Sequence, residues 1–252
     1  MKKTGLIIAL TVFFVITILT AGCVNTGVAA SSQQTSPQTS QQTIPTATPD
    51  MSGDINDVGR AGEVSSGSTG SNGKNVLVIY FSRTGEQYGV GVIGKGNTAI
   101  VADMIKEATG AESYEILPET DYYPYTYNEL TDIAKKEQSE NARPAYKKNV
   151  PDLSKYDTVF IGAPVWWGDW PMICYTFFEE NSESLAGKTL IPFCTHAGSG
   201  LSGFDGKLSS ALPKSNVGKG LAIYGSDAQK NSDTAKTEVN DWLSQVLNTE
   251  TS

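Results

Sequence analysis

The chain has 252 residues, three cysteines, one histidine and a net charge of −8. Residues 75–252 alone carry 15 Lys or Arg against 23 Asp or Glu, and such an acidic balance disfavours binding to nucleic acid. A single histidine makes a zinc site or a Ser-His-Asp hydrolase difficult to assemble. We therefore expect neither a nucleic-acid partner nor a metal site.

Residues 1–22 have the pattern of an export signal. Lys2 and Lys3 precede an apolar run over 5–19, and small residues then lead to Cys23. The pattern is similar to that of lipoprotein signals, in which the cysteine is lipidated, although Thr20 stands where such signals usually have Leu. An uncleaved helical anchor and a cleaved, secreted product are the alternatives. All three predict a domain outside the cytoplasm, either held on the outer face of the cell membrane or released from it.

Residues 23–74 are rich in Ser, Thr, Gln, Pro and Gly and have few large apolar side chains. Such a segment cannot bury enough apolar surface to offset its ordering entropy, so it is predicted to be a disordered linker. A flexible chain of this length spans about 40 Å. Residues 75–248 are long enough for one domain with a full core, and 249–252 are a short tail.

Four apolar runs in this domain have the length of strands, at 76–81, 158–162, 189–195 and 221–224, and a further short strand is predicted at 113–117. They lie tens of residues apart, too far for hairpins, and helical patterns separate them. Ile100, Val101, Met104, Ile105 and Ala108 share one helix face. Another helical face comprises Ala235, Val239, Trp242, Leu243 and Val246. This alternation predicts a doubly wound α/β fold with a parallel sheet covered on both faces.

Ligands of such folds bind beyond the carboxyl ends of the strands, so the loops that follow the strands are the candidate site. After the first strand come Ser82, Arg83, Thr84 and Gly85, and Asn97 and Thr98 open the next helix, which is expected to begin near residue 99. Small hydroxyls and glycines before a helix N-terminus suit a phosphate group. The alternative is an ordinary Ser/Thr helix cap.

Residues 82–85 joined directly to 97–98 resemble the flavodoxin phosphate loop, Ser/Thr-x-Thr-Gly-Asn-Thr, which normally runs without interruption. Here 86–96 intervene. The resemblance therefore requires this glycine-rich insertion to loop out and return the chain to Asn97.

Three tryptophans within five residues follow the third strand, in the run Pro164, Val165, Trp166, Trp167, Gly168, Asp169, Trp170. The Pro-x-Trp-Trp-Gly pattern resembles flavodoxin-like proteins, and Trp166 and Trp167 are candidates to flank a planar flavin ring. Either one could instead plug the core under the loop. Trp170 is expected to be packing.

A second glycine-rich loop follows the fourth strand and contains Thr195, His196, Gly198, Ser199 and Gly200. Its glycines allow backbone N–H groups to approach a ligand closely. In the resembled family this loop embraces the pyrimidine side of the flavin. His196 could act on the flavin or serve a hydrogen bond within the loop.

Two further features carry no assigned ligand role. Residues 118–150 include a helical pattern near 126–136 and the tyrosines Tyr122, Tyr123, Tyr125 and Tyr127, whose rings could wall a pocket or seal a core edge. Cys174 and Cys194 lie in apolar runs without metal spacing, so buried free thiols are preferred over a disulfide.

The resemblance as a whole implies a five-stranded flavodoxin-like sheet of order 2-1-3-4-5 and FMN as the cofactor. It implies electron transfer as the function, with unknown redox-protein or quinone partners. Two alternatives stay open: an FMN-dependent NAD(P)H:quinone reductase, and a surface protein that has lost the flavin. No catalytic residue is assigned, because the cofactor supplies the redox chemistry.

Overall fold

The computed structural model describes residues 75–248. The predicted signal, Cys23 and the linker lie outside the described residues, as does the 249–252 tail. Within 75–248, no helix is both long enough and apolar enough to cross a membrane.

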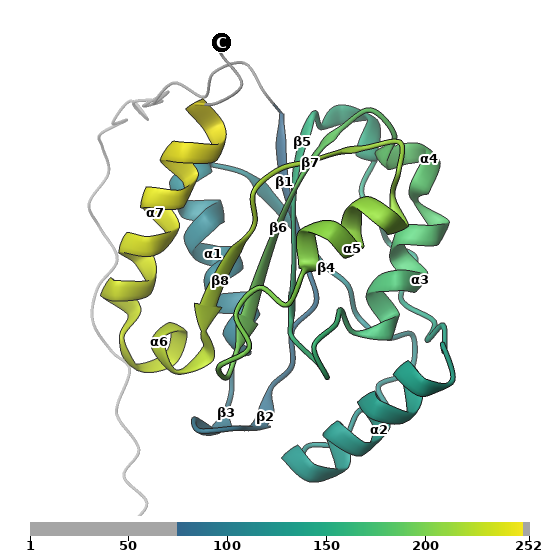
Figure 1. Ribbon diagram of the computed structural model, residues 1–252, viewed down its shortest axis with the longest axis vertical. Helices are drawn as coiled ribbons and strands as arrows, with labels where there is room; N and C mark the ends of the chain where they lie inside the picture. Colours follow the sequence, from purple (N-terminus) through teal and green to yellow (C-terminus); the bar gives the residue numbers. More distant parts are fainter. Residues whose placement is uncertain (1–74, 249–252) are drawn as a thin grey trace, which may run out of the picture. The chain divides into compact units, whose positions relative to one another are not determined.

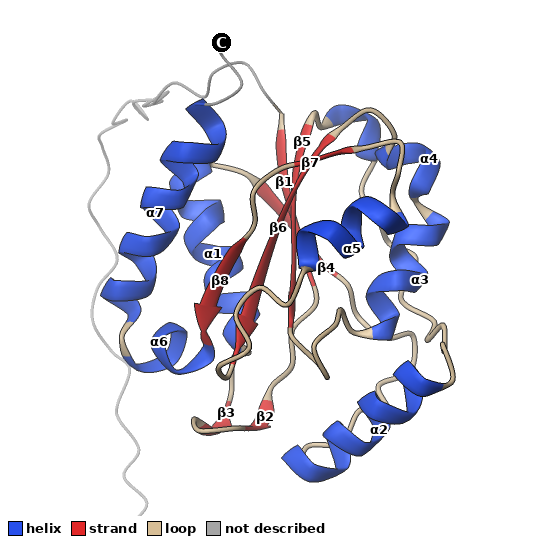
Figure 2. Ribbon diagram, viewed as in Figure 1, coloured by secondary structure: helices blue, strands red, loops and turns tan. Residues whose placement is uncertain are grey.

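A parallel sheet forms the centre of the domain (Figure 2). Its five principal strands run in the spatial order β4 (Glu112–Glu115), β1 (Val76–Tyr80), β5 (Thr158–Pro164), β6 (Thr189–His196) and β8 (Leu221–Tyr224). Counted along the chain this is the order 2-1-3-4-5, so the predicted topology is confirmed. The two-residue strand β7 (Asn216–Val217) also pairs with β6 and was not predicted.

Helices cover both faces of the sheet, as Figure 1 shows. On one side lie α1 (Asn97–Thr109), α6 (Gly225–Lys230) and α7 (Ser232–Asn248). On the other lie α3 (Met172–Glu180), α4 (Ser182–Leu185) and α5 (Phe204–Ala211). The α1 helix begins at Asn97, two residues earlier than expected.

Successive side chains of a strand point to opposite faces, and this alternation builds two cores. In β1, Leu77 and Ile79 join the core under α3 and α5, whereas Val78 joins the core under α1 and α7. Both predicted helix faces are buried, apart from Ile100, which is partly buried, and Ala108, which is exposed near the end of α1. Cys174 and Cys194 are fully buried free thiols, as preferred from the sequence.

Two insertions extend the domain beyond the ends of the strands. The 86–96 stretch, predicted to loop out, forms most of a hairpin of β2 (Gly85–Gln87) and β3 (Gly91–Ile93). The 118–150 stretch carries α2 (Tyr127–Ser139), and the short 3₁₀ helix η1 (Leu153–Lys155) follows it. Figure 1 shows the hairpin and α2 at the same end of the sheet.

Candidate functional site

A pocket of about 210 Å³, open to solvent, lies at the carboxyl ends of the parallel strands. Seven of the sixteen predicted site residues line it: Asn97, Pro164, Val165, Trp166, Trp167, Thr195 and His196. The three strand-end loops singled out from the sequence therefore meet at one place.

The hairpin insertion returns the chain to the start of α1, as the resemblance required. Gly96 packs so closely on the first loop that a Cβ there would lie 2.1 Å from Ser82 Oγ and 2.6 Å from the Arg83 carbonyl oxygen. The two halves of the interrupted phosphate pattern are thus adjacent. The first turn of α1 has no acidic residue, and the N–H groups at a helix start have no intrahelical partners, so those that Ser82 does not bind are available to an anion.

Two hydroxyls of this loop make internal hydrogen bonds. Ser82 Oγ accepts from the Ala99 N–H at 3.1 Å, so Ser82 serves as the cap that the sequence left as an alternative. The hydroxyls of Thr98 and Thr195 lie 2.7 Å apart and join the start of α1 to the end of β6. Both Ser82 and Thr98 are buried, whereas Thr84 is exposed. Their roles as phosphate ligands stay predictions.

Arg83 and Gly85 hold the segment that precedes α2. The Arg83 guanidinium donates to the Asp121 carboxylate at 2.8 Å and to the Tyr123 carbonyl at 2.7 Å. Its Nε is buried and has no hydrogen-bond partner among the described residues. Gly85 has a φ of 91°, and a Cβ there would lie 2.6 Å from the Tyr125 carbonyl oxygen. Neither residue lines the pocket.

The tryptophan run forms a two-residue turn. Trp166 and Asp169 exchange two backbone hydrogen bonds of 3.0 Å, and the residues between them, Trp167 and Gly168, have φ angles of 50° and 73°. Positive φ at both central positions is the geometry of a type I′ turn. A bulky residue such as Trp167 rarely adopts this conformation, so neighbouring contacts must hold it.

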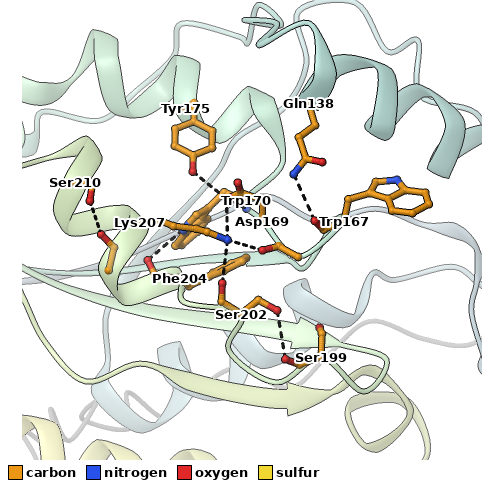
Figure 3. A network of polar contacts seen from close by, with 12 residues as sticks. Gln138, Trp167, Asp169, Trp170, Tyr175, Ser199, Ser202, Phe204, Lys207 and Ser210 are labelled. Atoms are coloured by element: carbon orange, nitrogen blue, oxygen red, sulfur yellow. Dashed lines mark hydrogen bonds and ion pairs between the residues drawn. The ribbon is translucent and has the colours of Figure 1, made fainter.

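Those contacts come from α2. The Trp167 indole N–H donates to the Thr131 carbonyl at 2.8 Å, and Gln138 donates to the Trp167 carbonyl (Figure 3). Lys135 Nζ lies 4.8 Å from the centre of the indole ring. Trp167 is nevertheless 51% exposed, so it is a pocket wall rather than a core residue.

The other two tryptophans lie deeper. Trp166 both lines the pocket and packs edge-on against Phe81 and Tyr123, with ring centres 5.4 and 5.3 Å away. Trp170 is 1% exposed and stacks on Phe204, as expected for a packing residue. Trp166 therefore packs on core residues and also lines the pocket, and its place beside a flavin ring stays a prediction.

His196 lies at the end of β6, nearly buried beside Tyr224. Its Nδ1 accepts a hydrogen bond from the Gly198 N–H at 3.0 Å, which leaves the proton of the neutral ring on Nε2. Burial lowers the pKa of the imidazole, with a smaller opposing effect from Asp227. The histidine thus serves its own loop and is favoured in the neutral form at the pocket wall.

The remaining predicted residues, Gly168, Gly198, Ser199 and Gly200, are wholly or partly exposed and do not line the pocket. Sequence reasoning missed eight residues that do: Gln87, Tyr88, Tyr127, Leu130, Thr131, Ala134, Ala197 and Gly225. The α2 members have i, i+3, i+4, i+7 spacing, which could have indicated one helix face. Gly225 directly follows the last strand and could have been found by the strand-end rule.

A parallel sheet of this order, with a Ser/Thr loop at a helix N-terminus and an aromatic turn beside it, defines a flavodoxin-like α/β protein. The family described as Flavodoxin matches residues 75–246, and the chain belongs to that family. No curated protein sequence matches it.

Many solved structures are similar to the chain. A candidate flavoprotein from Bacteroides eggerthii is 30% identical, with a TM-score of 0.54 over 69% of this chain and 98% of its own. One from Bacteroides uniformis is 33% identical, with a TM-score of 0.52 over 67% and 99%. A Lactobacillus acidophilus flavoprotein solved in complex with FMN is 20% identical, with a TM-score of 0.49 over 63% and 97%.

Proposed function

We propose that the domain binds FMN and acts as an electron carrier, tethered outside the cytoplasm by its N-terminal segment. The observation that carries the proposal is the convergence of the N-terminus of α1, an aromatic turn and a glycine-rich loop at one pocket. FMN combines an anionic phosphate with a planar aromatic ring, and this pocket offers a complementary group to each. When bound, FMN supplies the capacity to accept and donate one or two electrons.

Three groups of residues of the chain would bind different parts of FMN. Residues 82–85 with Asn97 and Thr98 would hold the phosphate, Trp166 and Trp167 would flank the ring, and residues 195–200 would face its polar edge. His196 would offer its Nε2 proton as a hydrogen-bond donor. The net negative charge of the domain would disfavour the negative charge that a flavin gains on full reduction. This would lower the reduction potential and would suit a low-potential electron donor.

Titration with FMN and with riboflavin tests the phosphate assignment. Thr84→Ala and Asn97→Ala should each weaken FMN binding by about 1 to 3 kcal/mol, because they remove or displace groups at the phosphate. Riboflavin, which lacks the phosphate, should bind nearly as before. Thr237→Ala on the exposed face of α7 is the matched control. Equal affinity of the parent protein for both ligands would refute the phosphate site, and no binding of either would favour a protein that has lost the flavin.

A second candidate function is favoured by the walls of the pocket. Tyr88 of the hairpin and Leu130 and Ala134 of α2 add an apolar and aromatic surface that could accept a second planar molecule. An FMN-dependent NAD(P)H:quinone reductase would use such a surface. Rapid oxidation of NADH or NADPH in the presence of a quinone would establish this candidate. Reduction by a one-electron donor with negligible nicotinamide oxidation would favour the carrier.

A further inference from the structure

Lys207, in the first half of α5, bridges two loops that approach the pocket from different strands. Its ammonium group donates hydrogen bonds to the Gly168 carbonyl and, at 3.0 Å, to the Ser202 carbonyl. It also lies 3.5 Å from the Asp169 carboxylate. An ammonium group has three N–H donors, and these three acceptors match that number. Figure 3 shows Lys207 at the centre of this network.

The residues that accept these hydrogen bonds belong to loops that lie beyond the last paired residues of β5 and β6. The β5–β6 ladder ends at the pair Pro164 and Thr195, followed by one further bond from the Val165 N–H to the Thr195 carbonyl. Beyond it, Gly168 and Asp169 belong to the tryptophan turn. Ser202 belongs to the loop that follows His196, and its hydroxyl donates to the Ser199 carbonyl. At their base the two loops are joined by the Trp170 indole N–H, which donates to the Phe204 carbonyl at 3.2 Å, and Lys207 adds the tie at their tips.

Lys207 is anchored well enough to provide that tie. Phe204 and Leu208, on either side of it in α5, are fully buried. The Asp169 carboxylate is itself held by the Tyr175 hydroxyl at 2.9 Å and the Trp170 N–H at 2.7 Å. The Lys207 side chain is about one-third exposed (34%), so its charge keeps contact with water and avoids a large desolvation cost.

We infer that Lys207 is a positioning residue, which fixes the distance between the tryptophan turn and the 197–203 loop and so shapes the ring end of the cofactor site. The part that concerns the flavin rests on the proposed function. Lys207 does not line the pocket. Its effect on a ligand must therefore pass through Trp166 and Trp167 on one side and His196 and Ala197 on the other.

The first arm of the test uses the flavin-free full chain in detergent micelles. Lys207→Met keeps the aliphatic stem but removes all three donors. Lys214→Met is the matched control, because Lys214 only pairs with Glu183 at an exposed site. Hydrogen exchange should become at least about threefold faster at the amides of 166–169 and 198–203 in Lys207→Met, and not in the control. Unchanged exchange in these two segments would overturn the inference whether or not the protein binds a flavin.

The second arm adds ligand. Lys207→Met should weaken FMN and riboflavin by the same factor, about 5- to 50-fold, and change the visible spectrum of the bound flavin, because both ligands share the ring. An effect on FMN alone would overturn the inference by placing Lys207 at the phosphate. A lower melting temperature with unchanged affinities and spectrum would overturn it in favour of a purely structural role. If the parent chain itself binds no flavin, the proposed function fails, while the first arm still decides whether Lys207 ties the loops.

Discussion

Replacing Gly96 by alanine tests the closure of the interrupted phosphate loop. A Cβ at Gly96 would lie 2.1 Å from Ser82 Oγ, 2.6 Å from the Arg83 carbonyl oxygen and 3.0 Å from the Arg83 nitrogen. The Ser82 hydroxyl could rotate away only by giving up its bond to the Ala99 N–H. The Arg83 contacts are backbone, so the loop itself would have to move.

The expected magnitude follows from three effects. Overpacking costs about 1 to 3 kcal/mol, and loss of the Ser82 cap costs about 1 kcal/mol more. Gly96 has a φ of −65°, which alanine adopts without strain. Alanine also lowers the conformational entropy of the unfolded chain, and this stabilises the folded state by about 0.4 to 1 kcal/mol. The net prediction is a loss of about 1 to 3.6 kcal/mol in the free energy of unfolding. FMN affinity should fall by about tenfold more than riboflavin affinity, because the phosphate end is the part displaced.

Urea unfolding and parallel titrations with the two flavins measure these changes. Gly94→Ala is the control, since a Cβ there meets nothing within 4 Å and its φ is not in the left-handed region. The control should stay within about 0.5 kcal/mol of the parent. If Gly96→Ala were as stable as Gly94→Ala and kept the parent's preference for FMN, the close approach of the two loop halves would be refuted.

Three other outcomes are expected. Trp170→Ala should lower the free energy of urea unfolding by about 3 to 5 kcal/mol, because it empties a fully buried site against Phe204. Trp167→Ala should lower it by less but should change the spectrum of bound flavin. A larger loss of stability in Trp167→Ala than in Trp170→Ala would contradict these assignments. The folded state disfavours protonated His196, so the unfolded chain binds more protons below the ordinary pKa of 6.5. The free energy of unfolding should therefore fall as the pH drops through 6.5 toward the lowered pKa of His196. This pH dependence should be absent in His196→Gln. An NMR titration of the His196 imidazole with its midpoint at or above pH 6.5 would contradict the prediction. Thr98→Val should lower the free energy of unfolding by about 1 kcal/mol, because it removes the hydroxyl bond to Thr195. An unchanged midpoint in urea unfolding would contradict this prediction.

Much of the fold was predictable from local pattern. Continuous apolar runs separated by helical periodicity indicated a parallel sheet, and the observed strands differ from the predicted ones by at most two residues at either end. The three loops at the pocket were predictable for the same reason, because the carboxyl ends of parallel strands share one edge. The dipeptide Trp166-Trp167 after β5 was a local signal and needed no knowledge of distant contacts.

What only the tertiary structure decided depends on segments far apart in the sequence. The 86–96 insertion has no strong apolar pattern, and its hairpin is visible only once Glu86 pairs with Val92 and contacts the start of α2. The periodicity of α2 could indicate an apolar face but not which surface that face covers, so its pocket residues were missed. The role of Lys207 was likewise hidden, since its acceptors are backbone carbonyls and a carboxylate brought together by the fold. Backbone acceptors are common to all residues and leave no mark in a sequence, so a side chain that binds them can be recognised only in three dimensions.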